Sequence, residues 1–463
     1  MHVTIFENVP FDELEVGMEA ENRRLCVADD LYVFAHASGN LNPLHLPKED
    51  GDKDGKPEAV APSFWVGSLI SSVLGNKLPG PGTLYKSQTL RFLGRAHAGD
   101  ELVARVKLIR KTDERSAIFE TTVALADGTV LVEGEAEVFA PTEKHSFDIH
   151  DVPGLTVESH RHFDKLLEMA EPLPAVRMAV VAPEEENSLR GALMAAKHTL
   201  IIPILIGNAA KIRSVAEQNG LSLDGIDIVD CATHPEAAQT AVTMVHEGRA
   251  GAIMKGHLHT DDLLRPILRT NGGLKTGRRI SHIFVMDVPG LNHLLLVTDA
   301  AINIAPDLPT KVDIVQNAID LAQSLGIETP KVGVLSAVET INPQIPSTLD
   351  AAALSKMADR GQITGGMVDG PLAMDNAVSL SAARTKGLKS LVAGQAEILV
   401  APNLESGNML AKELSFIAHA EAAGVVIGAR CPIVLNSRSD SDKSRLASCA
   451  VAALHAQRVG VHI

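Results

Sequence analysis

The hydrophobic positions of this chain follow two different patterns, one before and one after about residue 150. In the first part, an apolar stretch with helical spacing over 62–78 precedes four segments in which apolar and polar residues alternate or nearly alternate. These four segments, each closed by Gly or Asp turns, are LYKSQTLRFLG, DELVARVKLIRKTD, SAIFETTVALADG and TVLVEGEAEVFA. One helix followed by antiparallel strands predicts an α+β domain, with a curved sheet wrapped on a central helix.

From about residue 160 onward, short apolar runs alternate with amphipathic stretches. Ten runs have the length and composition of buried strands: MAVVA, TLIIPILIG, GIDIVDC, AGAIMKG, HIFVMDV, HLLLVTDA, KVGVLSAV, AEILVAP, GVVIGA and CPIVLNS. Between most of them lie helical stretches such as AAKIRSVAEQNG and KVDIVQNAIDLAQSLG. This alternation predicts an α/β domain whose mostly parallel sheet is covered on both faces.

The distribution of aromatic residues separates the two parts. Twelve of the fourteen lie within residues 1–163, and only Phe284 and Phe416 lie beyond. The first core is therefore built with aromatic side chains and the second with aliphatic ones. The segment between them is polar, contains Pro and lacks a clear period, which is typical of a linker. We predict domains at 1–143 and 159–463, joined by a linker at 144–158.

Composition restricts the class of protein. The net charge of −15 and the pI near 5.6 argue against nucleic-acid binding, because phosphate backbones need clustered Lys and Arg. The start of the chain lacks a signal-peptide pattern, and the longest apolar runs are too short to span a bilayer. The cysteines have no CxxC or CxxH spacing, so we expect reduced thiols in a cytoplasmic protein, with no zinc site and no disulfide framework. They are Cys26, Cys231, Cys431 and Cys449.

The most informative strand–helix junction is CPIVLNSRSDSDKSRL, where a buried strand ends and a helix begins near Lys443. The turn places Ser437, Arg438, Asp440 and Asp442 at the positive end of that helix, which favours anions. An Arg can bind phosphate through two hydrogen bonds, a Ser can donate to an oxyanion, and a carboxylate can act as a general base. The alternative is an ordinary helix cap, since Ser and Asp are common at helix starts.

Three other strand ends carry candidate ligand-binding residues, because ligands of open parallel sheets bind beyond the carboxyl ends of strands. They are Lys255 and Arg265 in MKGHLHTDDLLRPILRTNGG, Asp369 and Asp375 in GGMVDGPLAMDNA, and Gly407 and Asn408 in VAPNLESGNMLAKEL. A solvated helix position explains Arg265, and Asx turns explain the two aspartates, equally well in isolation. No junction carries GxxxxGK[ST] or GxGxxG, which disfavours nucleotide hydrolysis and dinucleotide binding.

These junctions together resemble the phosphate acetyl/butyryltransferase family. Six segments in the same order carry the resemblance over about residues 160–463: MKGHLHTDDLLRPIL, TDAAINIAPDLPTK, LSAVETINPQIPST, DGPLAMDNA, APNLESGNMLAKEL and NSRSDS. The resemblance implies a two-subdomain α/β fold similar to isocitrate dehydrogenase, with the active site between the subdomains. It also implies the reversible reaction of acyl-CoA and phosphate to acyl phosphate and CoA, without a metal or bound cofactor.

The same resemblance assigns residue roles. Ser437 falls on the Ser that steadies the transition state, and Arg438 and Arg265 fall on Arg residues that hold phosphate. The CoA thiol must lose its proton to attack, because the thiolate is the nucleophile. In the acetyl-specific branch the base lies seven residues after the Ser, which here is Ser444. The SRSDS wording looks more like the butyryl branch, so we expect Asp440 to be the base, with Asp442 as the next candidate. We treat Lys255, Asp369, Asp375, Gly407 and Asn408 as candidates for phosphate or CoA binding.

The first 140 residues resemble MaoC-like enoyl-CoA hydratases, which have a hot-dog fold. The carriers are SGNLNPLH and LPGPGTLYKSQTLRFLGRAHAGDEL. In that family the loop reads Gly-Asp-x-Asn-Pro-x-His, so Gly39 and His45 match while Asn40 replaces the catalytic Asp. An amide keeps the hydrogen-bonding shape but accepts no proton, and general base catalysis typically contributes about 10²–10⁴-fold. The joined arrangement looks like bifunctional enoyl-CoA hydratase/phosphate acetyltransferases, and we expect its hydratase half to be impaired.

Three alternatives stay open. The hot-dog domain hydrates enoyl-CoA with His45 alone, whose ordinary pKa lies near working pH; the larger domain is a nucleotide-dependent dehydrogenase; or both domains only bind CoA. Because hot-dog domains commonly pair through their sheets, we expect a homo-oligomer, a dimer or higher. We expect acyl-CoA and phosphate as partners, and no nucleic acid or membrane.

Overall fold

The computed structural model describes residues 5–46, 59–148, 155, 157, 161–436 and 440–460. The chain forms two compact units, Met1–Val157 and Glu158–Ile463, which we describe separately. Within the described part of the chain, no helix combines the length and apolar character needed to cross a membrane.

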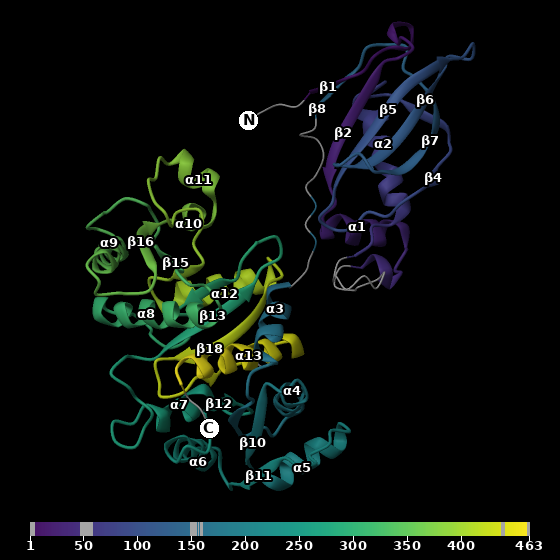
Figure 1. Cartoon of the computed structure of the whole chain (residues 1–463). Helices are drawn as coiled ribbons and strands as arrows, with labels where there is room; N and C mark the ends of the chain where they lie inside the picture. Colours follow the sequence, from purple (N-terminus) through teal and green to yellow (C-terminus); the bar gives the residue numbers. More distant parts are fainter. Residues whose placement is uncertain are drawn as a thin grey trace. The chain divides into compact units, whose positions relative to one another are not determined.

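The smaller unit is a curved antiparallel sheet with a helix packed against it (Figure 1). The strand order is β2-β5-β6-β7-β3, and β4 also pairs with β7. Its elements are β1 (Ile5–Glu7), β2 (Glu19–Leu25), α1 (Ala28–Ser38), α2 (Ser63–Asn76), β3 (Leu84–Gln88), β4 (Arg91–Phe92), β5 (Glu101–Lys111), β6 (Ser116–Leu125), β7 (Val130–Phe139) and β8 (Ser146–Asp148). The helix and the four strand segments expected from the sequence are therefore confirmed.

Alternation of side chains builds the core of this unit. Along β5, Leu102, Val106 and Leu108 are buried, and they share one core with Ile70 and Leu74 of α2. The segment expected as one strand, LYKSQTLRFLG, is divided into β3 and β4. At the division the chain passes Gly134 so closely that a Cβ on Gly134 would lie 1.9 Å from the Thr89 carbonyl oxygen.

Three short strands and α1 were not expected. β1 pairs with β8, which forms within the segment 144–158 that the sequence predicted as a linker, and β2 pairs with β5. Their sequences carry little alternation of apolar residues, because β2 is mostly charged (EAENRRL) and half-exposed. Their positions follow from pairing with distant strands rather than from a local pattern.

The larger unit contains one eleven-stranded sheet in the order β11-β10-β9-β12-β19-β18-β13-β14-β17-β15-β16. The strands are β9 (Val176–Val181), β10 (Ile201–Gly207), β11 (Asp227–Asp230), β12 (Ala252–Lys255), β13 (Ser281–Asp287), β14 (Leu295–Thr298), β15 (Lys331–Leu335), β16 (Met367–Leu372), β17 (Ile398–Val400), β18 (Glu421–Ile427) and β19 (Ile433–Val434). Neighbours are parallel except at β19–β18, β18–β13 and β13–β14. The sheet therefore has two parallel halves that run in opposite directions.

All ten predicted apolar runs form strands, and the mostly parallel sheet is confirmed. Only β16 was missed, because its sequence MVDGPL reads as a Gly-Pro turn. The opposed direction of the two halves has a consequence for the site. The carboxyl ends of β12 and β19 lie at one edge of the sheet, whereas those of β16 and β17 lie at the other.

Helices cover both faces of this sheet (Figure 1). They are α3 (Arg161–Ala170), α4 (Glu186–Lys197), α5 (Ala209–Gln218), α6 (His234–His246), α7 (Thr260–Ile267), α8 (Leu308–Ser324), α9 (Pro346–Asp359), α10 (Met374–Val378), α11 (Leu380–Thr385), α12 (Leu404–Phe416) and α13 (Asp442–Arg458). One face carries a single core with α3, α4, α5, α8, α9 and α13. The other face carries two cores, one under α6 and α7 and one under α10 to α12.

Candidate active sites

A cavity of about 300 Å³ lies where α12, the start of β18 and the start of α13 meet. Asn408 and Asp440, both candidates from the sequence, line it. The other lining residues are Phe284, Ala411, Lys412, Ser415, Phe416, His419, Ala420, Glu421, Ala422, Ser441 and Ser444. Residues from β13, α12, β18 and α13 thus meet at the carboxyl end of β19, where the sequence predicted the main site.

Buried hydrogen bonds hold the chain on both sides of residues 437–439. Asn436 is buried, and its Nδ2 donates to Asp440 Oδ2 at 3.2 Å and to Ser448 Oγ at 2.9 Å. Ser448 Oγ also accepts from the Gly424 backbone N–H at 3.1 Å. Asp440 is therefore anchored to β19, β18 and α13 through Asn436. Ser437 and Arg438 lie outside the described residues.

The first turn of α13 brings in a carboxylate that the sequence did not indicate. Ser441 caps the helix and accepts from the Ser444 N–H at 3.0 Å. The Ser441 hydroxyl donates to Glu421 Oε2 at 2.7 Å, and the Ser444 hydroxyl donates to the same oxygen. Glu421, the first residue of β18, is thus fixed at the cavity by two hydroxyls. Asp442 lies in the same first turn but does not line the cavity.

Lys255 ends β12, the strand beside β19. The two strands pair in register, with Met254 opposite Val434, so Lys255 lies next to the end of β19. Its Nζ donates to the Gly256 carbonyl at 3.3 Å. Arg265 lies on α7, and its side chain is 72% exposed and 3.9 Å from Asp262. Neither Lys255 nor Arg265 lines the cavity of Asp440.

The candidates from the opposite edge of the sheet divide into two groups. Asn408 lines the cavity and its Nδ2 donates to the Ala300 carbonyl at 3.0 Å. Gly407 has a structural role, because a Cβ there would lie 2.5 Å from the Asp299 carbonyl oxygen. Asp369 accepts a hydrogen bond from the next N–H at 2.8 Å, and Asp375 lies in the first turn of α10. Neither of these two aspartates lines the cavity.

A buried histidine lies behind this cavity and was not indicated by the sequence. His282 is 1% exposed, and burial lowers its pKa to about 4 against the opposing attraction of Asp299. Its ring packs edge-on against Phe284, with the ring centroids 4.4 Å apart, and Phe284 lines the cavity. His282 is therefore neutral at pH 7 and supports the cavity wall.

In the smaller unit, Asn40 and His45 lie together at a cavity of about 540 Å³. The other lining residues are Phe34, Ser38, Pro62, Ser63 and Phe64. Asn40 follows the end of α1, where Gly39 adopts a φ of 71° that suits glycine. The loop that the sequence singled out therefore forms one wall of a cavity, and the start of α2 forms another.

The hydrogen bonds of this loop define the protonation of His45. His45 Nδ1 lies 2.7 Å from the Val60 carbonyl oxygen, which can only accept, so Nδ1 carries a proton. In the neutral ring Nε2 is then an acceptor. Asn40 Oδ1 accepts from the Asn42 N–H at 3.3 Å. The amide thus completes a local turn, and His45 Nε2 is the proton acceptor that the pair retains.

Comparison with known proteins gives the family. Residues 233–453 match the phosphate acetyl/butaryl transferase model, and residues 12–129 match the MaoC like domain model. A phosphate acetyltransferase of Rhizobium meliloti is 57% identical over 297 residues, which cover 64% of this chain and 94% of that relative. The chain belongs to the phosphate acetyl/butyryltransferase family. Its hot-dog unit is MaoC-like.

Two further relatives agree with this family. A phosphate butyryltransferase of Clostridium acetobutylicum is 40% identical over 294 residues, which cover 64% of this chain and 98% of that relative. The solved structure of a branched-chain phosphotransacylase from Enterococcus faecalis V583 is similar with a TM-score of 0.54 and 32% identity, covering 61% of this chain and 99% of that one. Acetyl, butyryl and branched-chain names thus occur among the family members that this chain resembles.

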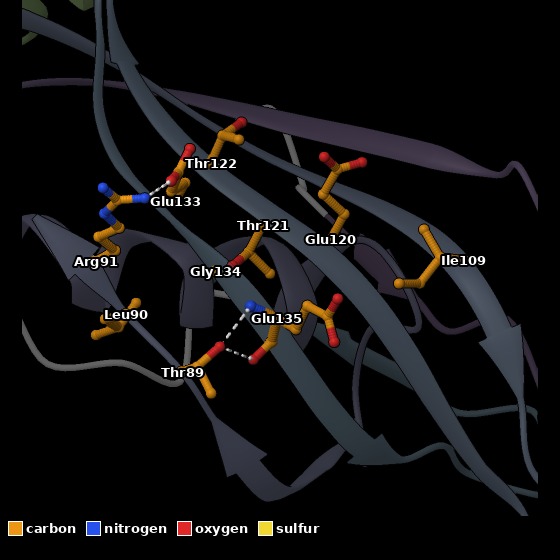
Figure 2. Close-up of a pocket in the computed structure, with 10 residues that line it drawn as sticks. All are labelled: Thr89, Leu90, Arg91, Ile109, Glu120, Thr121, Thr122, Glu133, Gly134 and Glu135. Carbon is orange, nitrogen blue, oxygen red and sulfur yellow. Dashed lines mark hydrogen bonds and ion pairs between the residues drawn. The ribbon is translucent and has the colours of Figure 1, made fainter. Parts of the chain in front are cut away.

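A further cavity of this family member lies on the outer surface of the hot-dog sheet (Figure 2). Figure 2 shows Glu120, Glu133 and Glu135 projecting from β6 and β7, with Arg91 on Glu133 at 3.4 Å. Neither Asn40 nor His45 lines it. Among the described residues, no group of three or more His, Cys, Asp or Glu is arranged to hold a metal ion. The acidic cavity is therefore separate from both candidate sites.

Proposed function

We propose that this chain transfers a short-chain acyl group reversibly between CoA and inorganic phosphate. The family supports this reaction, and the cavity that Asn408 and Asp440 share supports its location. The cavity lies at the start of α13, and the positive end of a helix favours an anion such as phosphate.

In this proposal, Ser437 donates to the developing oxyanion, and Arg438 and Arg265 hold phosphate. Asp440 is the sequence-based candidate for the base that takes the proton of the CoA thiol, with Asp442 next. Lys255 and Asn408 contribute to binding phosphate or CoA. The reaction needs CoA and phosphate as substrates and no metal. We also propose a fold related to isocitrate dehydrogenase, a homo-oligomer and a cytoplasmic location.

The MaoC-like unit is proposed to bind an acyl-CoA but to hydrate enoyl-CoA poorly. Asn40 accepts a hydrogen bond from its own loop and cannot take a proton at neutral pH. His45 Nε2 would have to activate water without a carboxylate beside it. The second candidate function, hydration by His45 alone, is supported by the shared cavity and by the fixed Nδ1 proton.

A thiol-release assay tests the main proposal. The full chain is incubated with acetyl-, propionyl-, butyryl- or crotonyl-CoA, with and without phosphate. We expect free CoA only when phosphate is present, and the fastest substrate identifies the acyl preference. NAD reduction in place of thiol release would support a dehydrogenase, and CoA binding without phosphate-dependent release would support a binding module.

A further inference from the structure

The cavity of the transferase unit contains two carboxylates from different elements. Asp440 precedes α13, and Glu421, nineteen residues earlier in the chain, begins β18, whose start lies beside the carboxyl end of the antiparallel β19. Only Asp440 lies in the SRSDS segment that the family pattern emphasises. Which of the two accepts a proton depends on what each already binds.

The Asp440 carboxylate belongs to a hydrogen-bond network with buried side chains. Its Oδ2 accepts from the buried Asn436 amide at 3.2 Å, and that amide also contacts Ser448. This network ties the end of β19 to α13, so moving or protonating Asp440 would disturb the connection between these two elements. Its hydrogen bonds indicate an anchoring role.

Glu421 is held at one oxygen. Ser441 and Ser444 both donate to Oε2, and Ser444 Oγ also accepts from the Ala422 N–H at 3.4 Å. These bonds fix the plane of the carboxylate at the cavity. Among the described residues, every hydrogen bond to its side chain reaches Oε2, which leaves Oε1 to accept a proton.

The position of Ser444 in the sequence links Glu421 to the family's base. It holds the seventh position after Ser437, which is the position that the resemblance to the acetyl-specific branch assigns to the base, and it lies on the first turn of α13. Here a hydroxyl fills that position and binds a carboxylate that arrives from β18. The Glu421 carboxylate therefore reaches the same point of the helix start from another strand.

We propose that Glu421 is the proton acceptor for the CoA thiol, and that Asp440 is a positioning residue. This rests on the proposed acyl transfer. The S–H proton passes to Glu421, the thiolate attacks the acyl carbon, and the C–S bond forms as the C–O bond to phosphate breaks. Glu421 then returns the proton to the departing phosphate oxygen, so the proton is conserved.

Other charged groups face Glu421 and define the controls. Lys412, His419 and Asp440 line the cavity, Asp287 lies opposite Glu421 across the β13–β18 pairing, and Asp442 and Lys443 follow on α13, with Lys443 3.2 Å from Asp164. Glu413, on α12 and outside the cavity, offers a matched acidic control.

The test measures CoA acylation by acyl phosphate from pH 6.5 to 8 in the full chain. Without a base the reaction needs thiolate already formed in solution, and the ordinary thiol pKa is about 8.5. We expect Glu421→Gln to lose about 10²–10⁴-fold at pH 7 and to recover about tenfold per pH unit. The acylation rates of wild type and Glu413→Gln should change little with pH. Asp440→Asn should lose activity by the same factor at each pH, because it alters the position of groups rather than proton transfer.

Three results overturn the assignment. Glu421→Gln within twofold of wild type, or a pH-independent loss in Glu421→Gln, would remove its role as proton acceptor. If instead the activity of Asp440→Asn recovered about tenfold per pH unit, Asp440 would be the proton acceptor. If the wild-type chain transferred no acyl group between CoA and phosphate, the proposed function itself would be wrong, and the assignment of a base would fall with it.

Discussion

The two candidate sites of this chain differ in the carboxylates that line their cavities. At the hot-dog cavity His45 is accompanied by an amide, Asn40, which accepts a hydrogen bond from Asn42 in its own loop, while His45 Nδ1 donates to the Val60 carbonyl. The transferase cavity has two carboxylates, Asp440 and Glu421, and Asn436, Ser441 and Ser444 donate hydrogen bonds to them. No carboxylate is among the described residues that line the hot-dog cavity, whereas the transferase cavity has one carboxylate more than the sequence pattern indicates. The two cavities therefore offer different acid–base groups to a bound substrate.

The largest expected effect would remove this difference. Asn40→Asp restores a carboxylate beside His45 without changing the size of the side chain. We expect crotonyl-CoA hydration by the full chain to rise about 10²–10⁴-fold, which is the usual contribution of a general base. His45→Gln in the Asn40→Asp background is the control and should abolish the gain. Fast hydration by the unmodified chain, unchanged by Asn40→Asp, would show that His45 suffices.

The next effect concerns the anion that distinguishes the transferase site. Arg438→Ala and Arg265→Ala should each weaken phosphate use by about 1.5–3 kcal/mol, or roughly 10- to 150-fold in kcat/KM for phosphate, if each binds the anion. Arg269→Ala, a neighbouring helix-end change, is the matched control. Phosphate kinetics equal to wild type in both variants would contradict the assignment of these two residues.

The sequence predicted the fold well because its apolar runs are local signals. Ten of the eleven strands in the larger unit follow from such runs, whereas β16 was hidden by its Gly-Pro pair. The opposed directions of the two sheet halves were not predictable, because they depend on pairing between β13, β14 and β18. Strand order is a long-range property that no window of the sequence contains.

Local sequence signals likewise named some of the residues that line the transferase cavity and missed others. Asp440 and Asn408, two of the candidates from the sequence, line one cavity, although they follow strands that end at opposite edges of the sheet. Glu421 was missed because it reaches the cavity only through the register of β18 against β13 and β19. The sequence analysis named Gly407 as a candidate binding residue. The structure gives a steric reason for a glycine there, since the Asp299 carbonyl oxygen leaves no room for a Cβ.

A smaller effect compares packing in the two units. Gly407→Ala would place a Cβ 2.5 Å from a backbone oxygen, and overpacking of this kind costs about 1–3 kcal/mol. Gly75→Ala, in α2 of the hot-dog unit, meets nothing within 4 Å and should stabilise by about 0.5–1 kcal/mol. Denaturant unfolding measures both. Equal changes in the two variants would show that Gly407 is not sterically required.

The smallest effect is a pH dependence of the larger unit. Burial lowers the pKa of His455 to about 4, and its Nδ1 lies 2.9 Å from Ser324 Oγ in the core. The unfolded state binds this proton below about pH 6.5 and the folded state does not, so stability is full above that pH and falls toward pH 4. The slope is about 1.4 kcal/mol per pH unit for one histidine. His455→Gln should reduce the slope measured by denaturant unfolding, and an unchanged slope would contradict it.

The most direct test of the account measures both activities in one preparation of the full chain. Phosphate-dependent thiol release is followed with acetyl- and butyryl-CoA, and hydration is followed with crotonyl-CoA. We predict that thiol release requires phosphate, and that hydration is at least about 100-fold slower than in the Asn40→Asp variant. Rapid hydration at the level of that variant, together with no phosphate-dependent thiol release, would contradict the account.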